Sequence, residues 1–511
     1  MSKADSEKLL KNRINELEQE NKRLHDTVEY LTRKLFGRSS EKTSALDLGQ
    51  ISFFDEAEIT ADPKAPEPNM QQVENYARKK FKGQRAELLK NLPHIKRLAS
   101  LFANDRDCEL CGTELVRVGE EFVRTEIEFI PAQINVIDHY RETYECRTCR
   151  KHGRPYMEKA PMPDPVIQHS MASPSSVAWV MHQKFVNALP LYRQEKEWEM
   201  LGVQLSRATM ANWIMAASRD WLSPIVERMH AQLLKEKHLH ADETTVQVMQ
   251  EENRKNTTDS YMWVYSTGAS SETPIRIFEY QPGRGGQYPQ KFLKGFNGYL
   301  HTDAFSGYEK VHGVTRCLCW THLRRYFVDS LPKDIKSPEA TLPSKGIAFC
   351  NELFRIEKTL DALSCEKRKE ERLKQEKPVL DSFWDWVEAN HMIVPPKSKA
   401  GEAFRYALNH KVEFMNYLND GACSISNNLA ENSIRPFTIG RKNWLFSGSP
   451  KGAVASATVY SIIETAKANG LNPYKYLSFL FKEMPGVLFK QYPEFLEDYL
   501  PWNSIVQDKC K

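Results

Sequence analysis

The chain has 511 residues, too many for one hydrophobic core, and we expect three or four domains. Hydrophobic residues make up 41% and charged residues 27%, ordinary values for a soluble globular protein. The net charge of +4 does not by itself indicate a nucleic-acid partner, so such a partner must be argued from local basic clusters. The charged start lacks an apolar signal region and no stretch approaches the ~18 apolar residues of a membrane span, which predicts a cytoplasmic protein.

Residues 8–36 carry a heptad pattern that is typical of a parallel two-stranded coiled coil. Asn21 in the seam would fix the register and the dimeric state at some cost in stability. We therefore expect a leucine zipper over 1–44 and a homodimer or higher oligomer; the alternative is an amphipathic helix packed on its own protein. The seam residues are Leu10, Ile14, Leu17, Asn21, Leu24, Val28, Leu31 and Leu35.

Residues 45–98 read as an acidic, proline-containing linker that ends in a basic cluster. Such a cluster suits contacts with DNA phosphates, although a solvated charged stretch is the better interpretation of a single run. The cluster consists of Arg78, Lys79, Lys80, Lys82 and Arg85.

Two Cys-x-x-Cys pairs within residues 99–160 predict a zinc ribbon. The ligands would be Cys108, Cys111, Cys146 and Cys149. Four thiolates leave no open position for chemistry, so the Zn²⁺ would be structural. Alternating residues between the pairs predict strands with a break at Pro131.

Residues 161–235 are expected to be helical, with a helix-turn-helix pattern that would bind DNA. The first helix ends near Leu201, Gly202 supplies the turn, and Ser206 caps the second helix. Arg207 and Asn212 would then lie on its exposed face. An ordinary helical pair packed in a core has nearly equal weight.

Three acidic residues stand in distinctive blocks: Asp242 in HLHADETTVQV, Asp303 in GYLHTDAFSGY and Glu431 in SNNLAENSIRP. The first two blocks predict strands and the third a helix start. Neighbouring strands would bring the two aspartates together, and a helical block over 340–420 accounts for the long interval before Glu431. Carboxylates of this kind can hold two Mg²⁺ (or Mn²⁺) ions beside a phosphate. Each acid alone is better explained as a solvated or helix-capping residue.

Further basic residues near the acids are candidate DNA contacts. His322, Arg324 and Arg325 occur in CWTHLRRYF, although a structural histidine is at least as good an explanation. Arg435 lies one helical turn after Glu431 and would bind phosphate or pair with that acid. Arg441 and Lys442 would extend a DNA track.

Taken together, these motifs resemble the DDE transposases of a large bacterial insertion-sequence family, the "IS sixty-six" type. The resemblance runs in order through LFGRSSEK, the paired Cys-x-x-Cys, LPLYRQEKEWEMLGVQLSRATMANW, HADETT, GYLHTDAFSGY, CWTHLRRYF, NNLAENSIRPF and IIETAKANGLNPYKYL. It covers nearly the whole chain. One departure is Ser426, where family members often carry Asp.

The resemblance implies a multidomain α/β protein with an RNase H-like catalytic core, and a metal-binding catalytic triad of Asp242, Asp303 and Glu431. The core would have a first part over 236–335, a helical insertion over 336–422 and a second part with the third acid over 423–480, followed by a C-terminal tail over 481–511. The partners implied are double-stranded DNA, as element ends and target, and small companion proteins of the same element.

The implied activity is hydrolysis of the 3′ strand ends at terminal inverted repeats, followed by joining of these ends to target DNA. Two other classes stay open. A DNA-binding regulator needs only the zipper, the ribbon and the helix-turn-helix, and a metal-dependent nuclease would cut without joining.

Overall fold

The computed structural model describes residues 133–152, 157–331 and 341–511. The expected zipper, the basic cluster from Arg78 to Arg85, and Cys108 and Cys111 lie outside these residues.

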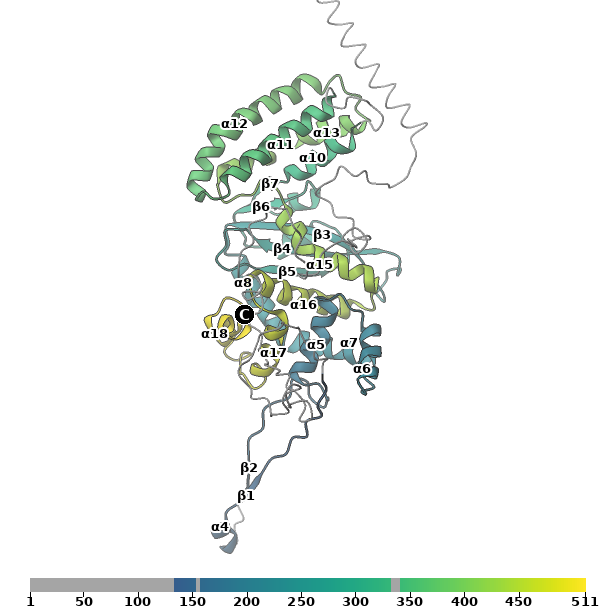
Figure 1. The fold of residues 1–511 in the computed structure, drawn as a ribbon, viewed down its shortest axis with the longest axis vertical. Helices are drawn as coiled ribbons and strands as arrows, with labels where there is room; N and C mark the ends of the chain where they lie inside the picture. The colour runs from purple at the N-terminus through teal and green to yellow at the C-terminus, as the bar shows by residue number, and fades with distance from the viewer. Residues whose placement is uncertain (1–132, 153–156, 332–340) are drawn as a thin grey trace, which may run out of the picture. The chain divides into compact units, whose positions relative to one another are not determined.

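Within the described residues, the centre of the fold is a six-stranded mixed sheet with the order β5-β4-β3-β6-β7 (Figure 1). The first three strands pair antiparallel, whereas β6 and β7 run parallel to β3, and β8 pairs with the far end of β3. The strands are β3 (His238–Val248), β4 (Asp259–Thr267), β5 (Arg276–Gln281), β6 (Tyr299–Thr302), β7 (Thr315–Leu318) and β8 (Phe446–Ser447).

The register places the first two acids near one another. His240 of β3 is opposite His301 of β6. Asp242 follows two residues further along β3, and Asp303 follows directly after β6. The prediction that neighbouring strands bring the two aspartates together is therefore confirmed.

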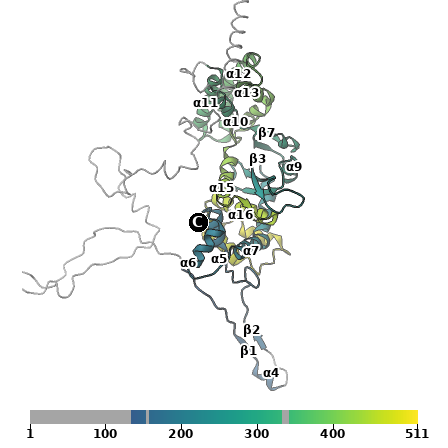
Figure 2. The ribbon, with the colours of Figure 1, turned by 90° about the vertical axis from the view of Figure 1, so that its right-hand side faces the viewer.

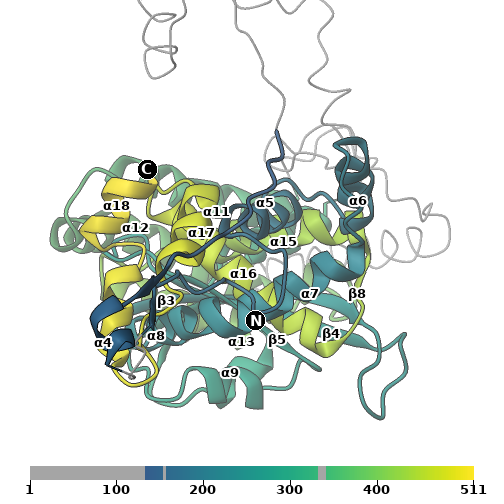
Figure 3. The ribbon, with the colours of Figure 1, turned by 90° about the horizontal axis from the view of Figure 1, so that it is seen from below.

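Helices from both ends of the described chain pack beyond β5. Figure 3 shows α16 beside α17, and α17 beside α18 and α5, as their contacts also require. The helices are α5 (Pro174–Phe185), α6 (Leu191–Met200), α7 (Arg207–Ala217), the π-helix η2 (Ser218–Leu222), α8 (Ser223–Leu233), α9 (Gln287–Phe292), α16 (Pro450–Ala468), α17 (Pro473–Glu483) and α18 (Ser504–Cys510). Short 3₁₀ turns are η3 (Ser306–Lys310) and η6 (Pro493–Tyr499).

Helix α16 covers the edge strand β5 and satisfies its backbone. Its small residues allow a close approach to the strand, and its hydroxyl groups accept hydrogen bonds from strand N–H groups. The N–H of Arg276 donates to Thr465 Oγ1 at 3.0 Å, and the N–H of Phe278 donates to Ser461 Oγ at 2.8 Å. These bonds pair N–H groups that an open sheet edge would leave without partners.

A layer of helices lies between β7 and the segment that carries Glu431, as expected for the block over 340–420. The helices are α10 (Trp320–Asp329), α11 (Leu342–Leu360), α12 (Cys365–Asn390), α13 (Lys399–Asn409), α14 (Lys411–Met415) and the 3₁₀ turn η5 (Asn416–Asn419). Aromatic side chains such as Trp320, Phe327 and Phe383 form a second hydrophobic core here. At the base of this layer the N–H of Trp320 donates to the Ile425 carbonyl at 3.1 Å, so its two ends meet.

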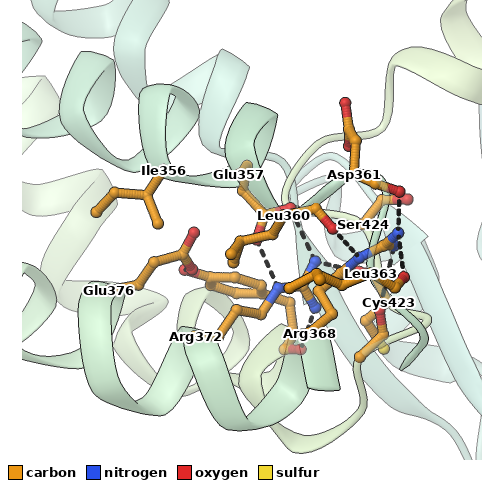
Figure 4. A network of polar contacts seen from close by, with 12 residues as sticks. Ile356, Glu357, Leu360, Asp361, Leu363, Arg368, Arg372, Glu376, Cys423 and Ser424 are labelled. Atoms are coloured by element: carbon orange, nitrogen blue, oxygen red, sulfur yellow. Dashed lines mark hydrogen bonds and ion pairs between the residues drawn. The ribbon is translucent and has the colours of Figure 1, made fainter. Parts of the chain in front are cut away.

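A buried arginine joins these helices to the chain that leaves them (Figure 4). The Arg372 guanidinium of α12 is 1% exposed and donates to both carboxylate oxygens of Glu357, at 2.5 and 2.9 Å. It also donates to the carbonyls of Tyr417, Asp420 and Cys423 at 3.3, 3.2 and 2.9 Å. This one side chain therefore holds α11, α12 and residues 417–423 together.

A small hairpin occupies the region of the second cysteine pair. Strands β1 (Thr143–Glu145) and β2 (Met157–Lys159) pair antiparallel, and α4 (Arg147–Lys151) follows β1. The alternating pattern predicted more strand than this. Within the described residues, 133–142 form no β-ladder. Their exposed apolar side chains, such as Val136 and Tyr140, have no sheet neighbour there to select the strand conformation.

The helix ends and the turn expected around Gly202 are present. Helix α6 ends at Met200, Gly202 turns the chain with φ +90°, and the Ser206 side chain accepts a hydrogen bond from the Thr209 N–H at the start of α7. None of the helices in the part of the chain that the structure describes has the length and apolar run needed to cross a lipid bilayer.

Candidate active site

Asp242 lies within β3, where the strand leaves the buried core. The N–H of Glu243 donates to Asp242 Oδ1 at 2.9 Å. Burial raises the pKa of the Asp242 carboxyl well above its ordinary value, and the negative charges of Glu243, Asp303 and Glu431 raise it further. The three predicted acids therefore lie close enough to repel one another.

Asp303 occupies the end of β6, and its side chain is only 29% exposed. The Phe305 N–H donates to Asp303 Oδ1 at 3.0 Å, which leaves the second oxygen directed elsewhere. That oxygen, Oδ2, is 3.9 Å from the Arg284 guanidinium. The turn after β6 therefore orients the Asp303 carboxylate through Oδ1 and leaves Oδ2 available as a ligand.

Glu431 lies in the first turn of α15 (Asn428–Trp444), the helix that Figure 2 shows beside β3. Its Oε1 is buried and has no hydrogen-bond partner within the described residues. His322 Nε2 lies 3.9 Å from this oxygen, and burial lowers the pKa of that imidazole. A buried carboxylate oxygen without a donor is what a cation would satisfy.

Asn427 attaches the start of α15 to the strand that carries Asp242. Its amide nitrogen donates to the Ala241 carbonyl at 2.9 Å, and its Oδ1 is 3.0 Å from His240 Nδ1. Its backbone N–H lies 3.1 Å from Cys319 Sγ. These contacts set the position of Glu431 relative to Asp242.

We expect Asn427→Ala to lower the free energy of unfolding by about 2–3 kcal/mol, because it leaves buried partners without hydrogen bonds. Strand cleavage should fall as well, since the start of α15 loses its attachment to β3. The neighbouring variant Asn428→Ala is the matched control, because Asn428 is exposed. Urea denaturation of both variants checks this, and equal midpoints would contradict the attachment.

Sequence reasoning missed a second group of residues at this site. Arg284, from the Gly-Arg-Gly-Gly turn after β5, donates to Glu243 Oε1 at 2.7 Å. The Tyr308 hydroxyl donates to Glu243 Oε2 at 2.6 Å. The Arg284 guanidinium also lies 4.0 Å from the centroid of the Phe305 ring. The only sequence signal for Arg284 was the GRGG segment, which is typical of a loop.

The donor set fits hard divalent cations such as Mg²⁺. It offers carboxylate oxygens from Asp242, Asp303 and Glu431, which is the ligand type that Mg²⁺ prefers. Their mutual repulsion and the unsatisfied Glu431 oxygen are both relieved by positive charge. The Cys319 thiol and His322 also lie within 4.8 Å of Glu431, which adds softer donors at one side.

The predicted DNA contacts take different positions. Arg207, Asn212, Arg325, Arg435 and Lys442 are exposed. Arg324 donates to Asn351 Oδ1 at 2.7 Å. Arg441 donates to Thr244 Oγ1 at 3.0 Å and to the Thr245 carbonyl, which fixes α15 along β3.

The second cysteine pair begins at Cys146, a half-buried residue after β1, and Cys149 belongs to α4. The first pair lies outside the described residues.

The chain matches models of known protein families. The family model described as "Transposase IS66 family" matches residues 169–455, and "IS66 C-terminal element" matches 461–502. "Zinc-finger binding domain of transposase IS66" matches 105–150, and "Transposase C of IS166 homeodomain" matches 23–97. The chain belongs to the IS66 family of transposases. The family implies DNA binding, and the zinc-finger match supports zinc binding.

Similar curated proteins come from Sinorhizobium fredii (strain NBRC 101917 / NGR234). The uncharacterized protein y4jD is 27% identical over 500 residues, which cover 94% of each chain. The uncharacterized protein y4hP is 27% identical over 478 residues, or 88% of this chain and 84% of the relative. The uncharacterized protein y4qI is 29% identical over 425 residues, or 80% and 76%.

Proposed function

We propose that this protein binds the terminal inverted repeats of an insertion sequence, hydrolyses the 3′ strand ends and joins them to target DNA. The proposal is supported by the pairing of β3, which carries Asp242, with β6, which Asp303 follows, and by the effect of the Asp303 and Glu431 charges on the pKa of Asp242. We further propose that the sheet and its helices form an RNase H-like core from 236–335 and 423–480, interrupted by the helical insertion 336–422. For the other domains we propose the bounds expected from the sequence, which are 1–44, 45–98, 99–160, 161–235 and 481–511.

In the proposed mechanism the three carboxylates hold two Mg²⁺ or Mn²⁺ ions. Ions bound there would lower the pKa of an attacking water and stabilise the leaving oxygen of an in-line displacement. Asp242 would be the ligand from β3, Asp303 the ligand that follows β6, and Glu431 the ligand from α15. The Arg284 side chain is 43% exposed, and Glu243 holds its guanidinium in place. The N–H groups that do not bind Glu243 can donate to a phosphate oxygen.

The test is cleavage and strand transfer on labelled DNA carrying the flanking inverted repeats, with Mg²⁺ or with EDTA. The native protein is compared with Glu431→Gln. Metal-dependent activity that the variant loses supports the proposal. Cutting without joining would indicate a nuclease, and binding without cutting would indicate a regulator or the need for a companion protein.

We also propose that the DNA contacts comprise the exposed Arg207 and Asn212 of α7 together with the basic cluster before residue 86. We further propose that the four ribbon cysteines, Cys108, Cys111, Cys146 and Cys149, hold a structural Zn²⁺.

Deletion of residues 1–36 should convert the protein to a monomer, because the heptad seam is the proposed dimer contact. Light scattering of the full chain and of the truncated chain measures this directly. Replacing Asn21 by Leu in the full chain is a useful companion, since it should keep association while relaxing the choice of a dimer. An unchanged mass after the deletion would place the contact elsewhere.

A further inference from the structure

A second group of metal-binding side chains lies in the core and contains none of the three acids. His301 belongs to β6, Cys317 to β7, and Cys423 to the segment before α15. One donor atom of each lies within 4.8 Å of the others, and all three residues are buried. Tetrahedral Zn²⁺ holds sulfur at about 2.3 Å and nitrogen at about 2.0 Å, so a modest contraction would close this group around an ion.

His238 of β3 lies outside this group of three but is a candidate for the fourth donor. Its side chain is 9% exposed, and its Nε2 makes no hydrogen bond within the described residues. The Cys423 thiol interacts with the side chains of Cys317, His238 and His301. An unpaired imidazole nitrogen in such a place is costly unless a ligand satisfies it.

We propose that His238, His301, Cys317 and Cys423 form a second, structural zinc site. Thiolate and imidazole donors select Zn²⁺ over the hard cations that suit the carboxylates. Two thiolates neutralise the charge of the ion, so the bound site is neutral and suited to burial. Asp420 Oδ2 lies 3.4 Å from His238 Nε2 and would have to move aside when that nitrogen binds the ion.

Zinc binding would release the protons of the two thiols. The Cys317 neighbour and burial raise the pKa of the Cys423 thiol to about 12, so without metal this thiol keeps its proton. Binding exchanges two S–H protons, released to solvent, for two S–Zn bonds. His301 accepts a hydrogen bond at Nε2 from the Ser424 N–H at 3.0 Å, and a metal on that nitrogen would displace it.

A metal here would join three strands to the chain that re-enters the core. Residues 420–424 connect the helical layer to α15, which carries Glu431. Zinc at this point would therefore fix the approach to α15 independently of Asn427.

The test removes the other expected zinc first. The full chain is prepared with Cys108, Cys111, Cys146 and Cys149 all replaced by Ser, and its metal content is measured by mass spectrometry after purification with zinc. We expect about two zinc ions in the native chain and about one in this variant. Cobalt substitution should show the charge-transfer absorption of two thiolates. A variant that retains no metal would overturn the proposal.

Single changes in that background locate the remaining ion. Cys317→Ser should lose it, whereas Cys319→Ser should keep it. Cys319 is the matched control because it is also buried and lies within 4.8 Å of His322 and Glu431. Metal lost on Cys319→Ser, or cobalt absorption from a single thiolate, would assign the ion to the active site and refute the second zinc site. If Cys317→Ser fails to fold, the cobalt spectrum of the parent variant still decides.

Discussion

Replacing Asp242 by Asn should reduce DNA strand cleavage by about a thousandfold or more, while DNA binding and folding are retained. The expected loss follows from the several kcal/mol that metal ions contribute to the transition state of phosphoryl transfer, at about 1.4 kcal/mol for each tenfold in rate. Asp303→Asn and Glu431→Gln should behave alike, because the three carboxylates act as one ligand set.

Thermal unfolding separates this effect from a loss of structure. Burial raises the pKa of Asp242 well above its ordinary value, and the nearby negative charges, including those of Asp303 and Glu431, raise it further. An amide at position 242 removes part of that repulsion, so without metal the midpoint of unfolding should stay the same or rise. Glu252→Gln, at an exposed carboxylate between β3 and β4, is the control and should cleave normally. Normal cleavage by any one of the three variants would remove that residue from the triad.

Replacing Arg372 by Met should lower the free energy of unfolding by about 3–5 kcal/mol, because it leaves the Glu357 carboxylate buried without its partner. The carbonyls of Tyr417, Asp420 and Cys423 also lose their donor. Urea denaturation followed by tryptophan fluorescence is suitable, since Trp384 and Trp386 lie in the same hydrophobic core.

The control for Arg372 is Arg355→Met on the neighbouring helix. Arg355 also pairs with a glutamate, Glu352, but its side chain is 66% exposed. Exposed pairs contribute little, so this variant should stay within about 0.5 kcal/mol of the native protein. Equal destabilisation by the two changes would mean that burial of Arg372 is not what makes its ion pair important.

The elements that carry the three acids could be predicted from sequence because each block follows a local pattern that the tertiary structure preserves. Asp242 interrupts an apolar strand, Asp303 ends one, and Glu431 begins a helix. The parallel direction of the pairing between β3 and β6 could not be predicted from sequence, whereas the helical block explains the remaining interval.

Other parts of the site depend on contacts between distant residues and carry no local signal. Arg372 stands in a run of charges that reads as a solvated helix face, and only its approach to Tyr417 and Cys423 makes it a buried residue. Arg284 and Asn427 act through β3, which is far away in sequence. Residues 133–142 do not form the expected strand for the same reason. A strand needs neighbouring strands to pair with, and an alternating pattern does not supply them.

The closure at the base of the helical layer has a consequence for how this family can diverge. Trp320 is bonded to Ile425, and Cys319 lies against the Asn427 N–H, so the chain leaves the sheet and returns at nearly one point. The length of the excursion between these contacts does not enter the geometry of the carboxylates. Lengthening a connection whose ends are already fixed costs little conformational free energy, about 0.6 kcal/mol for each doubling of a flexible loop. Differences in the length of helices 342–409 should therefore leave the carboxylates in register, as long as the contacts at the base of the layer are kept.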